Sequence, residues 1–157
     1  MAEYHLAQIN VARIKGVDIN DPVMIEFVEN LDHINALAES APGFVWRLKD
    51  DSNNATSLNP FGDAQVIINM SVWEDVPALE DYVFNTPHRE FLKRRREWFH
   101  KYGKASMALW WIQAGEIPSV EKGIEQLDHL QQNGATGRVF DFRQRFPPPA
   151  NKSRTSK

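Results

Sequence analysis

The pair of residues best suited to chemistry is Asn69 and Trp73, four positions apart in the segment AQVIINMSVW. This segment, residues 64–73, has the apolar character of a β-strand, and residues four apart in a strand share a face. An Asn amide can donate to and accept from a ligand oxygen, while an indole offers a flat wall and one N–H donor. The pair is therefore a candidate catalytic site. The alternative is a buried Asn that satisfies backbone groups beside a core Trp.

His88 is the third candidate catalytic residue, because it follows Thr86-Pro87 at a predicted helix start and its intrinsic pKa is near neutrality. The alternative is a structural histidine bonded to nearby backbone. The other histidines show no metal-ligand spacing such as H-E-x-x-H, and the chain has no cysteine. We therefore predict no metal site and no cofactor.

The run Lys93-Arg94-Arg95-Arg96 is the strongest cluster of charge. Such a run on a helix is usually a solvated face that pairs with nearby glutamates. Arg95, however, shares a helical stripe with His88 and Phe99 and could point inward as a substrate-binding residue. A net charge of −3 argues against a nucleic-acid partner.

Three further residues are candidate substrate-binding side chains: Asn10 in the first predicted strand, Trp46 in the second and Trp111 in the fourth. Trp46 has Arg47 as its neighbour and Trp111 follows Trp110. Because consecutive side chains in a strand point to opposite faces, one member of each pair must face each side of the sheet. The sequence does not decide which.

The elements that must position these residues follow the order strand, helix, strand, strand, helix, strand. The predicted strands are residues 4–11, 44–48, 64–73 and 106–114, and the predicted helices are 21–40, 74–85 and 86–103. Asp21-Pro22 supplies a typical helix start. This order predicts a ferredoxin-like α+β fold, with an antiparallel sheet and helices on one face. A C-terminal helix, from Val120 to about Asn133, and a strand over 138–146 are expected to follow.

Alternation along residues 64–73 predicts which side faces the helices. The row Val66, Ile68, Met70 and Val72 is uniformly apolar, so we expect it under the helices. The opposite row, with Gln65, Ile67, Asn69, Ser71 and Trp73, would then lie on an open face. A large apolar surface of this kind is normally covered. We therefore predict a homodimer that packs sheet on sheet and encloses a small-molecule pocket.

At 157 residues the chain fits one domain, predicted over 1–146, and the proline-rich residues 147–157 are expected to form a disordered tail. No stretch is apolar and long enough to span a membrane, and residues 1–6 do not read as a secretory signal. A cytoplasmic protein without a membrane partner is the expectation. Phosphate-binding loops and nucleophile-elbow motifs are absent from the sequence.

Three segments carry a family resemblance: PGFVWRL at 42–48, NMSVWE at 69–74 and LWWIQAGEIP at 109–118. Over residues 4–146 the chain resembles the dimeric α+β barrel superfamily, which includes antibiotic-biosynthesis monooxygenases and haem-degrading monooxygenases. More closely, it resembles an uncharacterised bacterial family with that fold. The resemblance implies a dimeric barrel and leaves the activity open.

The resemblance also implies roles. Cofactor-independent members use an Asn and a Trp to hold an electron-rich aromatic substrate that reacts with oxygen, and Asn69 and Trp73 match that pair. A monooxygenase for an aromatic or polyketide-like substrate is thus implied, and a non-catalytic dimeric binding or assembly module is the alternative. Haem-degrading members imply a third possibility, with Asn10 as the matching Asn. Their haem-ligating His, however, would fall near Lys93 and not at His88.

Overall fold

The computed structural model describes residues 3–49 and 60–149. Its strands are β1 (Tyr4–Arg13), β2 (Phe44–Arg47), β3 (Val66–Trp73) and β4 (Met107–Gln113). Its helices are a 3-10 turn (Pro22–Met24), α1 (Ile25–Glu39), α2 (Val76–Asn85), α3 (His88–Lys93), α4 (Arg95–Trp98) and α5 (Val120–Asn133). Residues 50–59, between the second and third predicted strands, and residues 150–157 of the predicted tail lie outside the described residues.

The four strands form one antiparallel sheet in the order β2-β3-β1-β4. The central pair places Asn10 directly opposite Asn69 and Leu6 opposite Trp73. Together with the helices between the strands, this order is the ferredoxin-like α+β arrangement, so the predicted fold class is confirmed.

Helix starts follow the predicted chemistry. Asp21 accepts a hydrogen bond from the Val23 N–H just before Pro22, and Asp75 accepts one from Ala78 N–H at the start of α2. The predicted helix over 86–103 is instead two short helices that are interrupted at Arg94. The interruption turns the chain so that Trp98, which is 2% exposed, packs against Phe27 of α1 at a ring distance of 5.6 Å.

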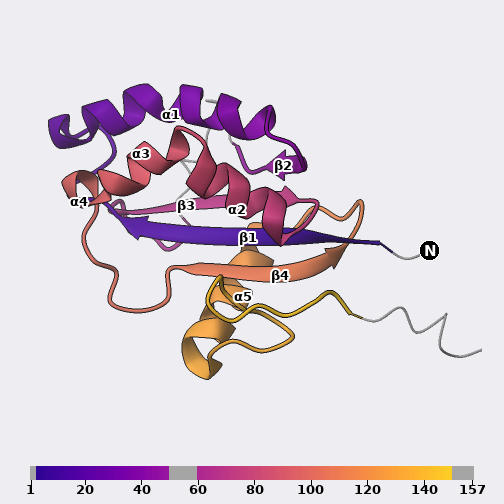
Figure 1. Cartoon of the computed structure of the whole chain (residues 1–157). Coiled ribbons are helices and arrows are strands. Elements are labelled where there is room, and N and C mark those ends of the chain that lie inside the picture. Colours follow the sequence, from indigo (N-terminus) through magenta and orange to yellow (C-terminus); the bar gives the residue numbers. More distant parts are fainter. Residues whose placement is uncertain (1–2, 50–59, 150–157) are drawn as a thin grey trace, which may run out of the picture.

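Helices cover both faces of the sheet, with α1 to α4 on one side and α5 on the other (Figure 1). The apolar row Val66, Ile68, Met70 and Val72 packs against Leu127 and Leu130 of α5. Gly123 allows this close approach, because a Cβ there would lie 2.9 Å from Met70 Cε. The expectation that this row lies under the helices that connect the strands was therefore wrong: a uniformly apolar row is also what one closely packed helix covers.

The opposite row faces α1 to α3. Trp73 belongs to a buried cluster with Leu79 and Tyr82 of α2, and Ala38 of α1. The prediction of an open face was wrong for Trp73, because α2 rather than a second copy covers it, whereas Asn69 is exposed. Since α5 already covers the other row within one chain, no second copy is needed to bury that row. The homodimer stays a prediction.

The C-terminal strand predicted over 138–146 is not formed. Phe140 alone pairs with Leu109, exchanging two backbone hydrogen bonds of 2.8 Å, and it is fully buried. The chain then leaves the β4 edge, and the Trp111 indole donates to the Phe146 carbonyl at 2.9 Å. Side-chain anchoring thus replaces the ladder that alternation suggested.

Within residues 3–49 and 60–149, no helix is long and apolar enough to cross a membrane.

Candidate functional site

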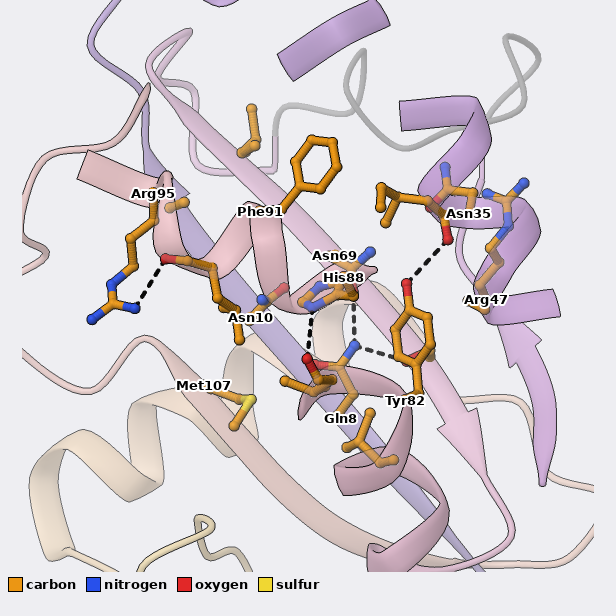
Figure 2. A pocket seen from close by; sticks show the side chains of 18 of the residues that line it. Gln8, Asn10, Asn35, Arg47, Asn69, Tyr82, His88, Phe91, Arg95 and Met107 are labelled. Carbon is orange, nitrogen blue, oxygen red and sulfur yellow. Dashed lines mark hydrogen bonds between the residues drawn. The ribbon is translucent and has the colours of Figure 1, made fainter. Parts of the chain in front are cut away.

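A cavity of about 400 Å³ lies between the sheet and helices α1 to α3 (Figure 2). Its walls are mainly apolar and come from segments far apart in the chain, including Phe27, Leu31, Phe91, Phe99 and Met107. The polar side chains Gln8, Asn10, Asn35, Asn69, Ser71, Tyr82 and His88 also line it. A mostly apolar cavity with a few placed polar groups is typical of a small-molecule site.

A hydrogen-bonded row on β1 and β3 forms the floor. Gln8 Nε2 donates to Asn69 Oδ1 at 2.7 Å and to Ser71 Oγ at 2.8 Å, and Trp73 Nε1 donates to Ser71 Oγ at 2.8 Å. Because the Asn69 oxygen accepts from Gln8, its NH₂ group is the part left to face a ligand. Asn10, opposite Asn69 in the register, adds a second exposed carboxamide.

Trp73 is 1% exposed and its only N–H is already bonded to Ser71. Its ring stacks on Tyr82 at 5.1 Å and meets the edge of Phe44 at 5.4 Å. Tyr82 in turn donates its hydroxyl to the Ile34 carbonyl at 3.1 Å, and burial raises the pKa of its phenol. Trp73 therefore supports the floor, and its indole N–H does not face a ligand.

His88 begins α3 and is held by two local contacts. Its backbone N–H donates to Thr86 Oγ1 at 3.2 Å, and its Nδ1 lies 3.3 Å from the Val83 carbonyl oxygen. A carbonyl only accepts, so Nδ1 carries the proton and Nε2 keeps its lone pair. Burial, opposed by the Val83 hydrogen bond, lowers the pKa of His88. The ring is thus neutral at pH 7 and able to accept a proton.

Two arginines also line the cavity, and they differ in burial. Arg47 is 6% exposed, and its Nε donates to a Glu39 carboxylate oxygen at 3.1 Å. Arg95 is exposed and donates to the Leu92 carbonyl at 3.1 Å. In Figure 2 these two arginines lie toward opposite ends of the pocket, with Asn69 and His88 between them.

Of the seven predicted site residues, the cavity brings together Asn10, Asn69, Trp73, His88 and Arg95. Trp46 and Trp111 do not line it, so their assignment to the pocket was wrong. Trp46 packs against the apolar cluster on the α5 side of the sheet. Trp111 lies on the same face of the sheet as Trp73 but toward the C-terminal segment, beside Phe140 at a ring distance of 6.3 Å.

Sequence reasoning missed Gln8, Asn35, Arg47, Ser71 and Tyr82 as lining residues. Gln8 and Ser71 share the alternating faces of Asn10 and Asn69, so the same periodicity could have identified them. Asn35 and Tyr82 come from helices, and no local pattern distinguishes them from ordinary core-facing residues.

Comparisons with known proteins give a family and distant structural likenesses. No curated protein matches this chain. Among solved structures, a protein of unknown function from Nitrosomonas europaea is 10% identical over 74% of this chain and 96% of that chain, with a TM-score of 0.45. SnoaB, a cofactor-independent oxygenase from Streptomyces nogalater, is 15% identical over 72% of this chain and 95% of that chain, with a TM-score of 0.44.

A monooxygenase from the gene ActVA-Orf6 of Streptomyces coelicolor, in complex with the ligand nanaomycin D, is 14% identical over 73% of this chain and 92% of that chain, with a TM-score of 0.40. With TM-scores below 0.5, these likenesses carry no functional argument. The sequence comparison is stronger, because residues 5–156 match one family almost end to end. The chain belongs to the family described as Domain of unknown function (DUF3291).

Proposed function

We propose that this protein binds an oxygen-bearing aromatic molecule in the cavity and oxygenates it with O₂, without a metal or flavin. The observation that carries the proposal is the position of His88, whose Nδ1 lies against the Val83 carbonyl and leaves Nε2 to accept a proton, in the same cavity as the carboxamides of Asn10 and Asn69. A base and hydrogen-bond donors inside apolar walls are the groups that proton abstraction from a phenol requires.

Binding would use both kinds of lining group. The aromatic rings of Phe27, Phe91 and Phe99 offer flat apolar contact to a ring system. The Asn69 NH₂ group, with its oxygen fixed by Gln8, would donate to a substrate oxygen. Few polar groups are needed, since they fix orientation while the walls supply most of the buried area.

The reaction would begin when His88 Nε2 takes the hydroxyl proton of an anthrone-type substrate in its phenolic form. The anion that results is electron-rich, and hydrogen bonds from Asn69 would stabilise the negative charge on its oxygen. Reaction with O₂ at the carbon that was a CH₂ group places one oxygen atom there as a new carbonyl. The second oxygen leaves as water with the two hydrogens, so R₂CH₂ and O₂ give R₂C=O and H₂O.

Trp73, Ser71 and Gln8 are positioning residues in this proposal. Ser71 Oγ accepts from both Gln8 and Trp73, which holds the Gln8 amide where it bonds Asn69. This refines the role implied by resemblance, in which Trp73 contacts the substrate. Trp73→Phe is expected to loosen the floor, with a smaller loss of turnover than Asn69→Ala.

The experiment is oxygen uptake by metal-stripped protein with 1,8-dihydroxyanthrone. We expect one O₂ consumed per substrate and one ¹⁸O atom from labelled O₂ in the product. His88→Gln should lower kcat/KM by roughly 100-fold, which is the low end for losing a general base. His129→Gln, on α5 at the other face of the sheet, is the matched control and should retain activity.

Equal turnover by the parent protein, His88→Gln and Asn69→Ala would remove the assigned roles. Binding of the anthrone without oxygen uptake would instead favour the non-catalytic binding module.

A further inference from the structure

The lining of the cavity has an unusual balance of charge. Acidic residues outnumber basic ones in the chain, 21 against 18. Among the described residues that line the cavity, however, Arg47 and Arg95 are present and neither Asp nor Glu is. An apolar cavity whose fixed charges are all positive favours an anionic ligand, because low-dielectric walls strengthen the field inside it.

The two arginines contribute unequally to this field. Arg47 is buried and its charge is offset by Glu39, at 3.1 Å. Arg95 donates to a neutral backbone carbonyl, that of Leu92, and within residues 3–49 and 60–149 no carboxylate lies within ion-pair distance of it. Arg95 is therefore the lining cation with charge left to offer a ligand.

The neighbours of Arg95 show that carboxylates are available in this region. Lys93 pairs with Glu90 at 3.5 Å, and Arg94 pairs with Glu26 at 2.8 Å and Glu97 at 2.9 Å. Arg94 also lies over the Trp98 ring at 4.6 Å. In this run Lys93 and Arg94 therefore have carboxylate partners, whereas Arg95 lines the cavity.

We infer that the ligand is an aromatic carboxylate and that Arg95 binds its carboxylate group. A planar guanidinium matches a carboxylate with two parallel hydrogen bonds, and one uncompensated guanidinium matches one negative charge. This inference names the ligand class of the proposed function and rests on it only in using the same cavity. It does not depend on any reaction with O₂.

The arrangement also sets where the charge of the ligand must lie. Figure 2 shows Arg95 at one end of the pocket, with the Phe91, Asn69 and His88 side chains toward the middle. A carboxylate on Arg95 would direct the ring system toward the middle of the pocket. The oxygen function that meets Asn69 would then sit at the end of the ring system remote from the carboxylate.

Calorimetric binding of two isosteric probes tests the inference. The full-length protein should bind 2-naphthoate about 10-fold more tightly than neutral 2-naphthamide, the low end for a charge-assisted pair because Arg95 is exposed. Raising the ionic strength to 0.5 M should reduce this preference. Arg95→Gln should abolish the preference while the affinity for naphthamide stays unchanged.

Arg96→Gln is the matched control, since Arg96 is the adjacent cation and does not line the cavity. It should keep the preference for naphthoate. The inference is overturned if neither probe binds, if both bind equally to the parent protein, or if Arg96→Gln loses as much preference as Arg95→Gln. A preference that depends on Arg95, found in protein that consumes no oxygen, would support the inference and remove the oxygenase proposal.

Discussion

His88 shows how one backbone contact sets the chemistry of a side chain. The sequence placed a titratable group at a helix start, where either nitrogen could carry the proton. The Val83 carbonyl assigns the proton to Nδ1, and burial disfavours the imidazolium. The base that the proposed reaction needs is therefore a consequence of where α2 ends relative to α3.

The lowered pKa of His88 predicts a pH dependence of stability. In the unfolded chain His88 binds a proton with the ordinary pKa of 6.5, and in the folded chain it does so only at lower pH. Between these two pKa values the unfolded state therefore binds more protons than the folded state. The contribution of neutral His88 to the free energy of unfolding should therefore be complete above about pH 6.5 and be lost as the pH drops through the folded pKa. Urea unfolding at pH 7.5, 6.0 and 5.0 measures this fall, and His88→Gln should reduce it.

The loss of stability from acidic groups falls at a lower pH than the loss from His88. The carboxyls whose pKa is lowered, among them Asp21 and Glu97, start from ordinary values of 3.8 and 4.5, so their loss of stability occurs at lower pH. An unchanged slope between pH 5.0 and 7.5 in His88→Gln would show that the burial of His88 has no such effect.

At the scale of elements, the connection from α1 to β2 depends on Gly43. Its φ of +83° is in the left-handed region, and a Cβ there would lie 2.5 Å from the Cβ of Ala78 in α2. The Gly43 carbonyl also accepts from the Glu74 N–H at 2.8 Å, next to the start of α2. Gly43 therefore fixes how closely β2 and α2 approach, and with them the wall of the cavity.

Gly43→Ala should be more destabilising than Gly62→Ala. Gly62 has a φ of +67° but nothing within 4 Å of its Cβ position, so it shares the backbone strain without the collision. The difference between the two variants should be about 1–3 kcal/mol, the usual cost of overpacking. Chemical unfolding followed by circular dichroism measures both, and equal losses would mean that the Ala78 contact is easily relieved.

For the whole molecule, the C-terminal helix α5 covers the face of the sheet that the other helices leave open. Its buried residues Leu127 and Leu130 cover Ile9, Met70 and Trp110. The prediction of an open face came from counting only the helices between strands. Since α5 supplies the missing layer, assembly of copies through the sheet is not needed to bury this apolar row.

Leu127→Asp should therefore expose the sheet. Leu127 is 4% exposed, and an unpaired carboxylate there costs several kcal/mol. We expect stronger binding of a hydrophobic dye and self-association in size-exclusion chromatography. Gln132→Asp, on the exposed side of the same helix, is the control and should behave like the parent protein. A Leu127→Asp protein that stays compact and dye-free would show that α5 is dispensable for covering the sheet.

The sequence by itself determined the order of the four strands along the chain with the helices between them, the fold class and the grouping of side chains by face. Period-two alternation forces Asn69, Ser71 and Trp73 to the same side of β3, and helix starts such as Asp21-Pro22 follow from local chemistry. These are properties of short stretches of chain, so neighbouring residues suffice to predict them.

Only the tertiary structure decided which side of the sheet each helix covers, and hence where the cavity lies. Alternation divides β3 into two rows but is unchanged when the rows are exchanged, since both carry apolar residues. The choice depends on contacts between distant segments: Gly123 fits over Met70, and Tyr82 stacks on Trp73. The same long-range packing removed Trp46 and Trp111 from the site and brought Gln8, Arg47 and Tyr82 into it.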